Sequence, residues 1–151
     1  MTLRPTVALW KPKTPENIGA ALRACGCFDA DLVIVDPRCK MSKKKTQRRI
    51  NALATFARHT PYLIMDEASA LEWLDSRAEG VVPVEKTEAA LNLEIFGHSP
   101  AGVYVFGPEE GSVPARLIVE YGPPLRIPTV GCLDLAAAVA IILYDRASKL
   151  E

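Results

Sequence analysis

The strongest constraint on the fold of this 151-residue chain is the alternation of two hydrophobic patterns along it. Short apolar runs rich in β-branched residues predict strands at positions 6–9, 31–35, 62–64, 80–84, 102–106 and 125–127. Helical spacing of apolar residues predicts helices at positions 15–25, 48–57, 67–75, 114–120 and 133–149. This alternation is typical of an α/β fold with a mostly parallel sheet flanked by helices. We expect positions 86–100 to form a loop with one short helical turn.

The composition indicates one domain with a single core. Hydrophobic residues make up 49% of the chain, so we expect a single domain over residues 1–151. The 18 basic and 18 acidic residues cancel, so a nucleic acid would have to be bound by local charge. The chain shows no signal peptide and no apolar segment of membrane-spanning length, which predicts a soluble, cytoplasmic protein with no membrane partner. The four cysteines are irregularly spaced, and we expect no disulfide framework and no metal.

The first candidate site follows the first predicted strand directly. Thr14 suits the N-cap of a helix whose first residue is Pro15. Gly19 lies one helical turn before Arg23 and leaves room for a close approach there. Arg23 is therefore either a residue that meets a ligand or a second chain, or an ordinary solvated side chain, and this segment alone does not decide between the two.

The second candidate site is a basic run between positions 37 and 60, where no acidic residue occurs. The run consists of Arg38, Lys40, Lys43, Lys44, Lys45, Arg48 and Arg49. At this density, Lys and Arg would bind phosphates in a salt-dependent and largely sequence-independent way, which predicts an RNA-binding surface. A solvated loop without a ligand is the alternative. Base stacking would need aromatic side chains from elsewhere, such as Phe56 or Trp10.

The third candidate site lies in the last third of the chain. Gly107 and Pro108 make a sharp turn that places Glu109 at the carboxyl end of a predicted strand, where open α/β sheets usually bind ligands. The alternative for Glu109 is a plain strand-to-helix turn, with its charge near the helix dipole. The final helix is apolar nearly all round, which predicts burial on several sides and a subunit interface. Asp134 is either the N-terminal cap of that helix or a site residue.

Three motifs, taken in order, resemble those of the SpoU/TrmH branch of the SPOUT methyltransferases. They are Asn-Ile-Gly-x-x-x-Arg at 17–23, Phe-Gly-Pro-Glu at 106–109, and Ile-Pro at 127–128 before Cys-Leu-Asp-Leu-Ala-Ala-Ala. The resemblance covers nearly the whole chain and implies a C-terminal deep trefoil knot, an exception to the rule that folds avoid knots. It also implies a homodimer, S-adenosyl-L-methionine as cofactor and methylation of an RNA ribose 2′-hydroxyl. The short length is similar to that of the tRNA wobble-ribose enzymes, which favours tRNA over rRNA as the substrate.

The same resemblance implies roles for individual residues. Arg23 would activate or orient the hydroxyl, with Asn17 and Glu109 in support. Because an arginine stays protonated far above neutral pH, orienting the ribose or a phosphate describes Arg23 better than acting as a general base. The cofactor contacts would be Phe106, Gly107, Pro108, Glu109, Ile127, Pro128, Cys132 and Leu133. The chemistry needs positioning and removal of one proton, and the sulfonium supplies the electrophile without a metal.

Three positions depart from the commonest family pattern. Cys132 stands where many members have serine, and Gly111 comes one residue earlier than usual. Asp134 stands where asparagine is usual, and an ionised carboxylate only accepts hydrogen bonds. Our hypothesis is that Asp134 pairs with Arg23 or helps to take the proton. Two other functions stay open, namely methylation of a base nitrogen and RNA binding by a knotted dimer without turnover.

Overall fold

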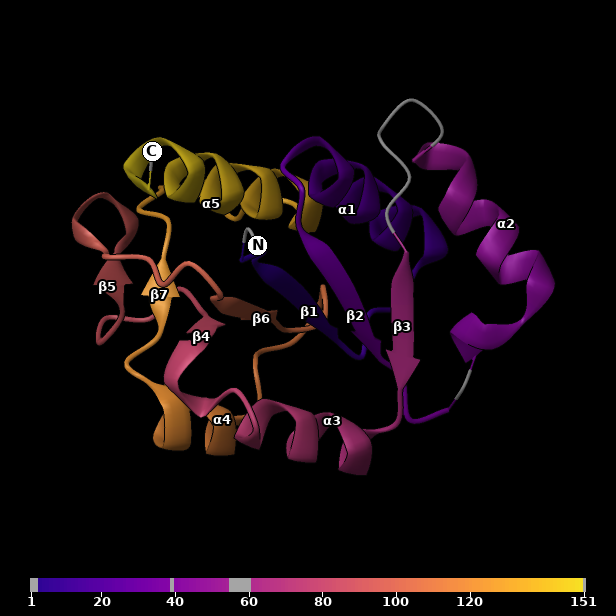
Figure 1. The fold of residues 1–151 in the computed structure, drawn as a ribbon, viewed down its shortest axis with the longest axis horizontal. Coiled ribbons are helices and arrows are strands. Elements are labelled where there is room, and N and C mark those ends of the chain that lie inside the picture. Colours follow the sequence, from indigo (N-terminus) through magenta and orange to yellow (C-terminus); the bar gives the residue numbers. More distant parts are fainter. Residues whose placement is uncertain (1–2, 39, 55–60, 151) are drawn as a thin grey trace.

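A single parallel β-sheet organises the structure, a computed structural model that describes residues 3–38, 40–54 and 61–150 (Figure 1). The seven strands of the described residues lie in the order β3-β2-β1-β6-β4-β7-β5, and their pairings are parallel. Their bounds are β1 Thr6–Trp10, β2 Asp31–Val35, β3 Tyr62–Met65, β4 Val81–Val84, β5 Leu91–Asn92, β6 Val103–Phe106 and β7 Leu125–Arg126. Parallel pairing brings the carboxyl ends of all these strands to the same edge of the sheet.

Helices cover both faces of this sheet, which confirms the α/β class. The bounds of the α-helices are α1 Pro15–Cys27, α2 Lys44–Leu53, α3 Glu67–Asp75, α4 Ala115–Tyr121 and α5 Leu135–Leu150. Three short 3₁₀ segments are η1 Lys40–Ser42, η2 Ala78–Gly80 and η3 Leu93–Ile95. In Figure 1, α1 and α5 lie on one face with α2 outside α1, and α3 and α4 lie on the other. The chain therefore forms three layers, with the sheet in the middle and helices on each side.

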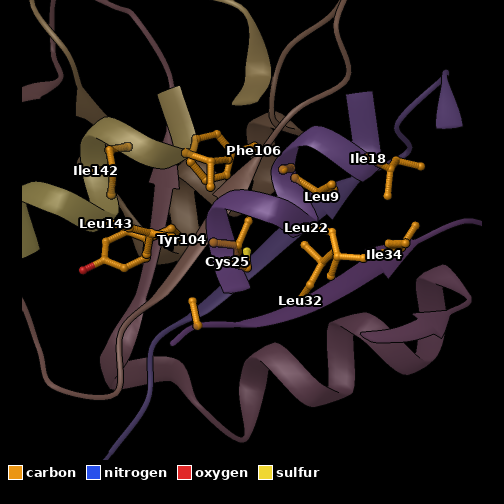
Figure 2. Packing of buried hydrophobic residues seen from close by; sticks show 14 of the residues in the cluster. Leu9, Ile18, Leu22, Cys25, Leu32, Ile34, Tyr104, Phe106, Ile142 and Leu143 are labelled. Carbon is orange, nitrogen blue, oxygen red and sulfur yellow. The ribbon is translucent and has the colours of Figure 1, made fainter. Parts of the chain in front are cut away.

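The core divides into two hydrophobic clusters, one under each helical layer. Along β1, Leu9 packs toward α1 and α5, whereas Ala8 and Trp10 pack toward α3 and α4, as the two-residue period of a strand requires. Figure 2 shows Leu9 among residues of α1, α5 and β6, including Leu22 and Ile142. The continuous apolar strands of the sequence are thus explained by burial on both faces.

Helix α1 begins where the sequence predicted. The side chain of Thr14 accepts a hydrogen bond from the main-chain N–H of Asn17 at 3.3 Å, and Pro15 occupies the first turn. The close approach expected at Gly19 is made by a neighbouring helix. A Cβ atom on Gly19 would lie 2.5 Å from the carbonyl oxygen of Ile50 in α2, so the absence of a side chain lets α2 pack against α1.

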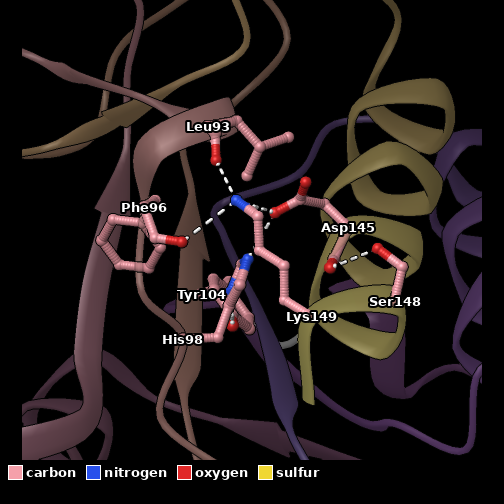
Figure 3. A network of polar contacts seen from close by, with 7 residues as sticks. All are labelled: Leu93, Phe96, His98, Tyr104, Asp145, Ser148 and Lys149. Carbon is pink, nitrogen blue, oxygen red and sulfur yellow. Dashed lines mark hydrogen bonds and ion pairs between the residues drawn. The ribbon is translucent and has the colours of Figure 1, made fainter. Parts of the chain in front are cut away.

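A buried polar network fastens the end of α5 to the sheet (Figure 3). His98 Nδ1 lies 2.5 Å from the Tyr104 hydroxyl, and His98 Nε2 lies 2.7 Å from Asp145 Oδ2. Burial raises the pKa of Tyr104, so its hydroxyl stays protonated and donates to Nδ1. Desolvation lowers the pKa of His98, whose neutral ring then donates from Nε2 to the carboxylate. Lys149 Nζ adds a bond to the carbonyl oxygen of Leu93 at 2.6 Å.

Two details of the predicted fold are wrong. The two-residue strand β5 falls in the segment expected to be a loop, although the helical turn expected there is present as η3. Helix α2 starts at Lys44 rather than at position 48, because a helix can begin with polar helix formers that carry no apolar period. The predicted end of that helix, at positions 55–57, lies outside the described residues.

Helix α5 is buried along one side within the single chain, and the subunit interface expected for it stays a prediction. Val139, Ile142 and Leu143 of this helix are buried, but Ile141 is 38% exposed and Tyr144 is 65% exposed. The helix lies on one face of the sheet beside α1, so its opposite side is uncovered within the single chain. No helix in the described part of the chain is long and apolar enough to cross a bilayer.

Candidate active site

A cavity of about 390 Å³ opens at the carboxyl edge of the sheet. Its walls come from the segments that follow β4, β6 and β7, together with the start of α5. Aliphatic side chains such as Val84, Leu125 and Ile127 form much of the lining, and carboxylates of Glu85, Glu109 and Asp134 reach its surface. The cavity is therefore mostly apolar, with a few polar groups, as small-molecule sites usually are.

The loop after β6 folds back on itself to form one wall of this cavity. A Cβ atom on Gly107 would lie 2.6 Å from the main-chain nitrogen of Val113, so only glycine fits where the two ends of the loop meet. The main-chain N–H of Gly111 donates to the Pro108 carbonyl oxygen at 3.1 Å and closes a turn at the tip. This path places Glu109 at the tip of the loop, facing the start of α1.

Glu109 and Asn17, both of which the resemblance assigned to the site in support of Arg23, meet across this junction. Asn17 Nδ2 donates to Glu109 Oε1 at 3.0 Å, and the main-chain N–H of Lys13 donates to Glu109 Oε2 at 3.0 Å. Lys13 Nζ also lies 2.7 Å from Glu110 Oε2 and holds the pKa of that carboxyl below its usual value. Both oxygens of Glu109 are thus held by donors from the segment after β1.

The residues expected to contact the cofactor gather at the cavity, with one exception. Phe106, Gly107, Pro108, Glu109, Ile127, Cys132 and Leu133 belong to its lining. The exception is Pro128, which is exposed and does not belong to the described lining, although its neighbours Ile127 and Thr129 do. Two loops far apart in the sequence therefore face each other across one cavity.

Asp134 is the cap of the last helix, which was one of the two roles that the sequence left open, and its role as a site residue stays a prediction. Asp134 Oδ1 accepts a hydrogen bond from the main-chain N–H of Ala137 at 2.7 Å, which caps the start of α5. The residue also lines the cavity. Arg23, in contrast, is exposed on α1 and lies outside the described lining, so its pairing with Asp134 stays a prediction.

Sequence reasoning missed the wall that comes from the end of β4. Glu85 and Lys86 line the cavity there, and Arg126 lines it at the end of β7. Lys86 Nζ donates to the Gly131 carbonyl oxygen at 3.2 Å and so bridges two segments of the lining. The available signal was the position of residues 85 and 86 directly after a predicted parallel strand, since such strands end at the ligand-binding edge.

The predicted basic run forms an exposed surface on η1, α2 and the residues before them, which we call the basic face. All seven of its residues are exposed: Arg38, Lys40, Lys43, Lys44, Lys45, Arg48 and Arg49. Arg49 pairs with Glu16 of α1, so one cation of the face also ties α2 to the helix that carries Asn17. Trp10 is only 2% exposed and cannot stack on bases, which corrects that expectation. Phe56 lies outside the described residues.

The chain belongs to the SpoU rRNA methylase family, whose model matches residues 4–144. This membership confirms the resemblance to the SpoU/TrmH enzymes and the class that it implied, an RNA methyltransferase.

In sequence, the chain is similar to a protein of Beijerinckia indica that is named tRNA (cytidine(34)-2′-O)-methyltransferase. The two are 24% identical over 92% of this chain and 88% of the relative.

Solved structures share the fold. An S-adenosylmethionine-bound rRNA methyltransferase from Sinorhizobium meliloti superposes with a TM-score of 0.79 at 23% identity, over the whole of this chain. This chain spans 58% of the length of that protein. A structure concerned with 2′-hydroxyl methylation of C/U34 on tRNA gives a TM-score of 0.76 at 21% identity, over 99% of this chain and 98% of the other. At these identities the superpositions establish the α/β fold of the family.

Proposed function

We propose that this chain transfers a methyl group from S-adenosylmethionine to the ribose 2′-hydroxyl of nucleotide 34 in tRNA. The observation that carries the proposal is the cavity at the carboxyl edge, beside which the Asn17–Glu109 hydrogen bond joins the first two motifs. The tRNA substrate is supported by the similarity to the Beijerinckia enzyme, which nearly matches this chain in length.

The residues of the cavity fit the proposed cofactor. Its apolar walls suit a flat adenine ring, and the carboxylates of Glu85, Glu109 and Asp134 suit a molecule that carries positive charge. Gly107, where a Cβ would collide with the returning loop, lets the main chain line the cavity closely. When bound, S-adenosylmethionine supplies an electrophilic methyl group on a sulfonium.

The residues around Glu109 would then prepare the ribose hydroxyl. Asn17 and the N–H of Lys13 hold the Glu109 carboxylate in one orientation, which is the positioning that in-line transfer requires. The guanidinium group of Arg23 would orient the ribose or its phosphate. Asp134, already the cap of α5, would accept a hydrogen bond at the opposite wall.

The basic face would bind the tRNA backbone. Its seven exposed cations stand against a chain of zero formal net charge, so the positive potential is local. Phosphate contacts of this kind position an RNA without reading its sequence. Choice of the nucleotide would therefore come from the active site and the shape of the tRNA.

The proposed enzyme acts in the cytoplasm as a homodimer of single-domain subunits. The uncovered apolar side of α5, with Ile141 and Tyr144, supports a second copy as its partner. A trefoil knot in the C-terminal part is supported by the position of β7, which pairs with both β4 and β5. Because residues 85–90 join β4 to β5, the chain that continues from β7 to α5 has to pass this connection.

The test is transfer of a labelled methyl group from S-adenosylmethionine to bulk tRNA, followed by nuclease digestion and nucleoside mass spectrometry. We expect a 2′-O-methylated nucleoside from position 34, and its loss by tenfold or more in Asn17→Ala and Arg23→Ala, because each removes a group that orients the reactants. Arg77→Ala, at an exposed arginine over the Trp73 ring beyond α3, is the matched control and should retain activity.

Other outcomes of the same experiment would contradict the proposal in different ways. A methylated base in place of a methylated ribose would identify a base-nitrogen enzyme. Methylation of rRNA but not tRNA would show that the substrate is rRNA rather than the proposed tRNA. Binding of cofactor and RNA without methyl transfer to tRNA or rRNA would identify an RNA-binding protein that lacks methyltransferase activity.

A further inference from the structure

We propose that Glu85 is a positioning residue that fixes the loop of residues 107–113 and, through it, the Glu109 carboxylate. The inference rests on the proposed function, because Glu109 and the cavity are the parts of the site that Glu85 would serve. None of the three sequence motifs includes Glu85, which lies directly after β4.

The main chain of Glu85 is held on both sides. Its N–H donates to the carbonyl oxygen of Leu125 in β7 at 3.0 Å, and its own carbonyl oxygen accepts from the N–H of Thr87 at 3.1 Å. The Glu85 side chain therefore starts from a main chain that is hydrogen-bonded to the sheet. A group that is to position another needs such a rigid support.

The side chain of Glu85 reaches across to the far end of the loop. Glu85 Oε2 accepts a hydrogen bond from the main-chain N–H of Val113 at 2.8 Å. A bond from an amide to an ionised carboxylate is shorter and stronger than a bond between neutral groups. The Val113 side chain is 2% exposed in the cluster under α3 and α4, so this residue is held by its side chain and by its main chain.

Fixing Val113 fixes the path of the whole loop. The loop leaves the sheet at Phe106, at the end of β6, and its two ends touch where Gly107 lies against Val113. Between these anchored ends, the turn from Pro108 to Gly111 carries Glu109 to Asn17. A shift of Val113 would therefore move Glu109, and a displacement of about 1 Å in an active site can cost about a hundredfold in rate.

Two substitutions separate the hydrogen bond from the charge. Glu85→Gln keeps an acceptor oxygen for the Val113 N–H but removes the negative charge, whereas Glu85→Ala removes both. Glu88→Ala is the matched control, because Glu88 is an exposed glutamate in the same connection between β4 and β5 and lies outside the described lining of the cavity.

The experiment uses the full chain and two readouts. The first is hydrogen exchange of the Val113 amide, measured by NMR, which reports the bond itself. The second is steady-state methyl transfer to tRNA, with KM for S-adenosylmethionine and kcat determined separately. We expect Glu85→Ala to speed exchange of Val113 at least tenfold and to lower kcat/KM at least tenfold. Glu85→Gln should keep Val113 exchange within about threefold of the parent and should lose less of kcat/KM than Glu85→Ala, and Glu88→Ala should match the parent.

Two results would overturn the inference. One is unchanged Val113 exchange and unchanged kinetics in Glu85→Ala. The other is Glu85→Gln as impaired as Glu85→Ala, which would show that the negative charge matters rather than the bond to Val113. Should Glu85→Ala fail to fold, Glu85→Asp, one methylene shorter, makes the same comparison. If the parent chain itself transfers no methyl group, the proposed function fails, whereas Val113 exchange still tests the contact.

Discussion

Asp134 combines a structural and a chemical position in one residue. Its carboxylate caps α5 through the N–H of Ala137 and also reaches the cavity. A carboxylate at a helix N-terminus gains both a hydrogen bond to an orphan N–H and a favourable interaction with the helix dipole. Asparagine, the residue usual in the family, can make the same capping bond without the charge.

The cap predicts how Asp134 variants change stability. Asp134→Ala should lower the free energy of unfolding by about 1 kcal/mol, which is about 2–4 °C in Tm for a chain of this size. Asp134→Asn should stay within about 0.5 kcal/mol of the parent because asparagine caps as well as aspartate. Thermal melts followed by circular dichroism measure both. Equal melts for the alanine variant and the parent would show that the cap adds nothing to stability.

The methyl-transfer activity of the same two Asp134 variants separates the capping role of Asp134 from a catalytic role. If Asp134 helps to take the hydroxyl proton, Asp134→Asn loses methyl transfer while it keeps the parent's stability. An unchanged rate and an unchanged pH profile in Asp134→Asn would instead assign Asp134 to the cap alone.

Those parts of the candidate site were predictable in which the type of a single residue indicates the local conformation. Thr14 and Pro15 mark a helix start, and Gly107 marks a turn at a strand end, so these residues could be placed from the sequence. Glu85 carries no such rule, because its role depends on a hydrogen bond to Val113, 28 positions away. The resemblance named Asn17 and Glu109 as site residues, but their contact with each other came only from the structure.

At the scale of elements, the sequence again predicted the features that carry a local pattern and missed those that do not. Strands β1, β2 and β6 were recognisable because their apolar residues are buried, whereas β5 is two residues long and has no period to detect. Helix α2 has one buried residue, Ile50, so its first turn was invisible to a hydrophobic pattern.

The network at the end of α5 predicts a pH dependence of stability. Besides Tyr104 and Asp145, the charged groups that act on His98 are Lys149 and Arg146 of α5. Desolvation lowers the pKa of His98 in the folded chain, so the unfolded chain binds the proton more tightly. The contribution of His98 is therefore complete above the unfolded pKa of about 6.5 and is lost as the pH falls through the folded pKa.

Unfolding at pH 7.5 and at pH 5.5 tests this contribution. The free energy of unfolding should fall between the two values in the parent, and the fall should be smaller in His98→Gln, which cannot take up the proton. His59→Gln, which removes the other histidine of the chain, is the control and should keep the parent's dependence. Denaturation by urea at each pH gives the free energies. The same fall in His98→Gln as in the parent would rule out His98 as its source.

The basic face predicts a salt-dependent affinity for RNA. Replacing Lys44 and Lys45 by alanine should make the slope of log affinity against log salt shallower by about two, about one for each lost phosphate contact. Arg77 and Arg116, replaced together, remove the same charge from the opposite side of the sheet and should leave the slope unchanged. Fluorescence anisotropy with labelled tRNA at four salt concentrations measures both pairs. Equal slopes for the two double variants would place the RNA elsewhere.

At the scale of the whole molecule, the uncovered side of α5 predicts a dimer. Ile141→Asp places an unpaired charge in the proposed interface, and such a burial costs about 3–5 kcal/mol, so the dimer should weaken at least a hundredfold. Val119→Asp is the control, because Val119 is 87% exposed on α4, across the sheet from α5. Sedimentation velocity gives the mass of each. A parent chain that sediments as a monomer, or an Ile141→Asp variant that remains a dimer, would contradict the proposed interface.

The walls of the cavity are drawn from positions as far apart as Asn17 and Ala138. A ribosome therefore has to translate past Ala138 before any product can hold the cofactor. Fragments released earlier would carry the residues of the basic face without a complete cavity. The proposed active site is thus completed late in synthesis and all at once, unlike a site whose residues are local in sequence.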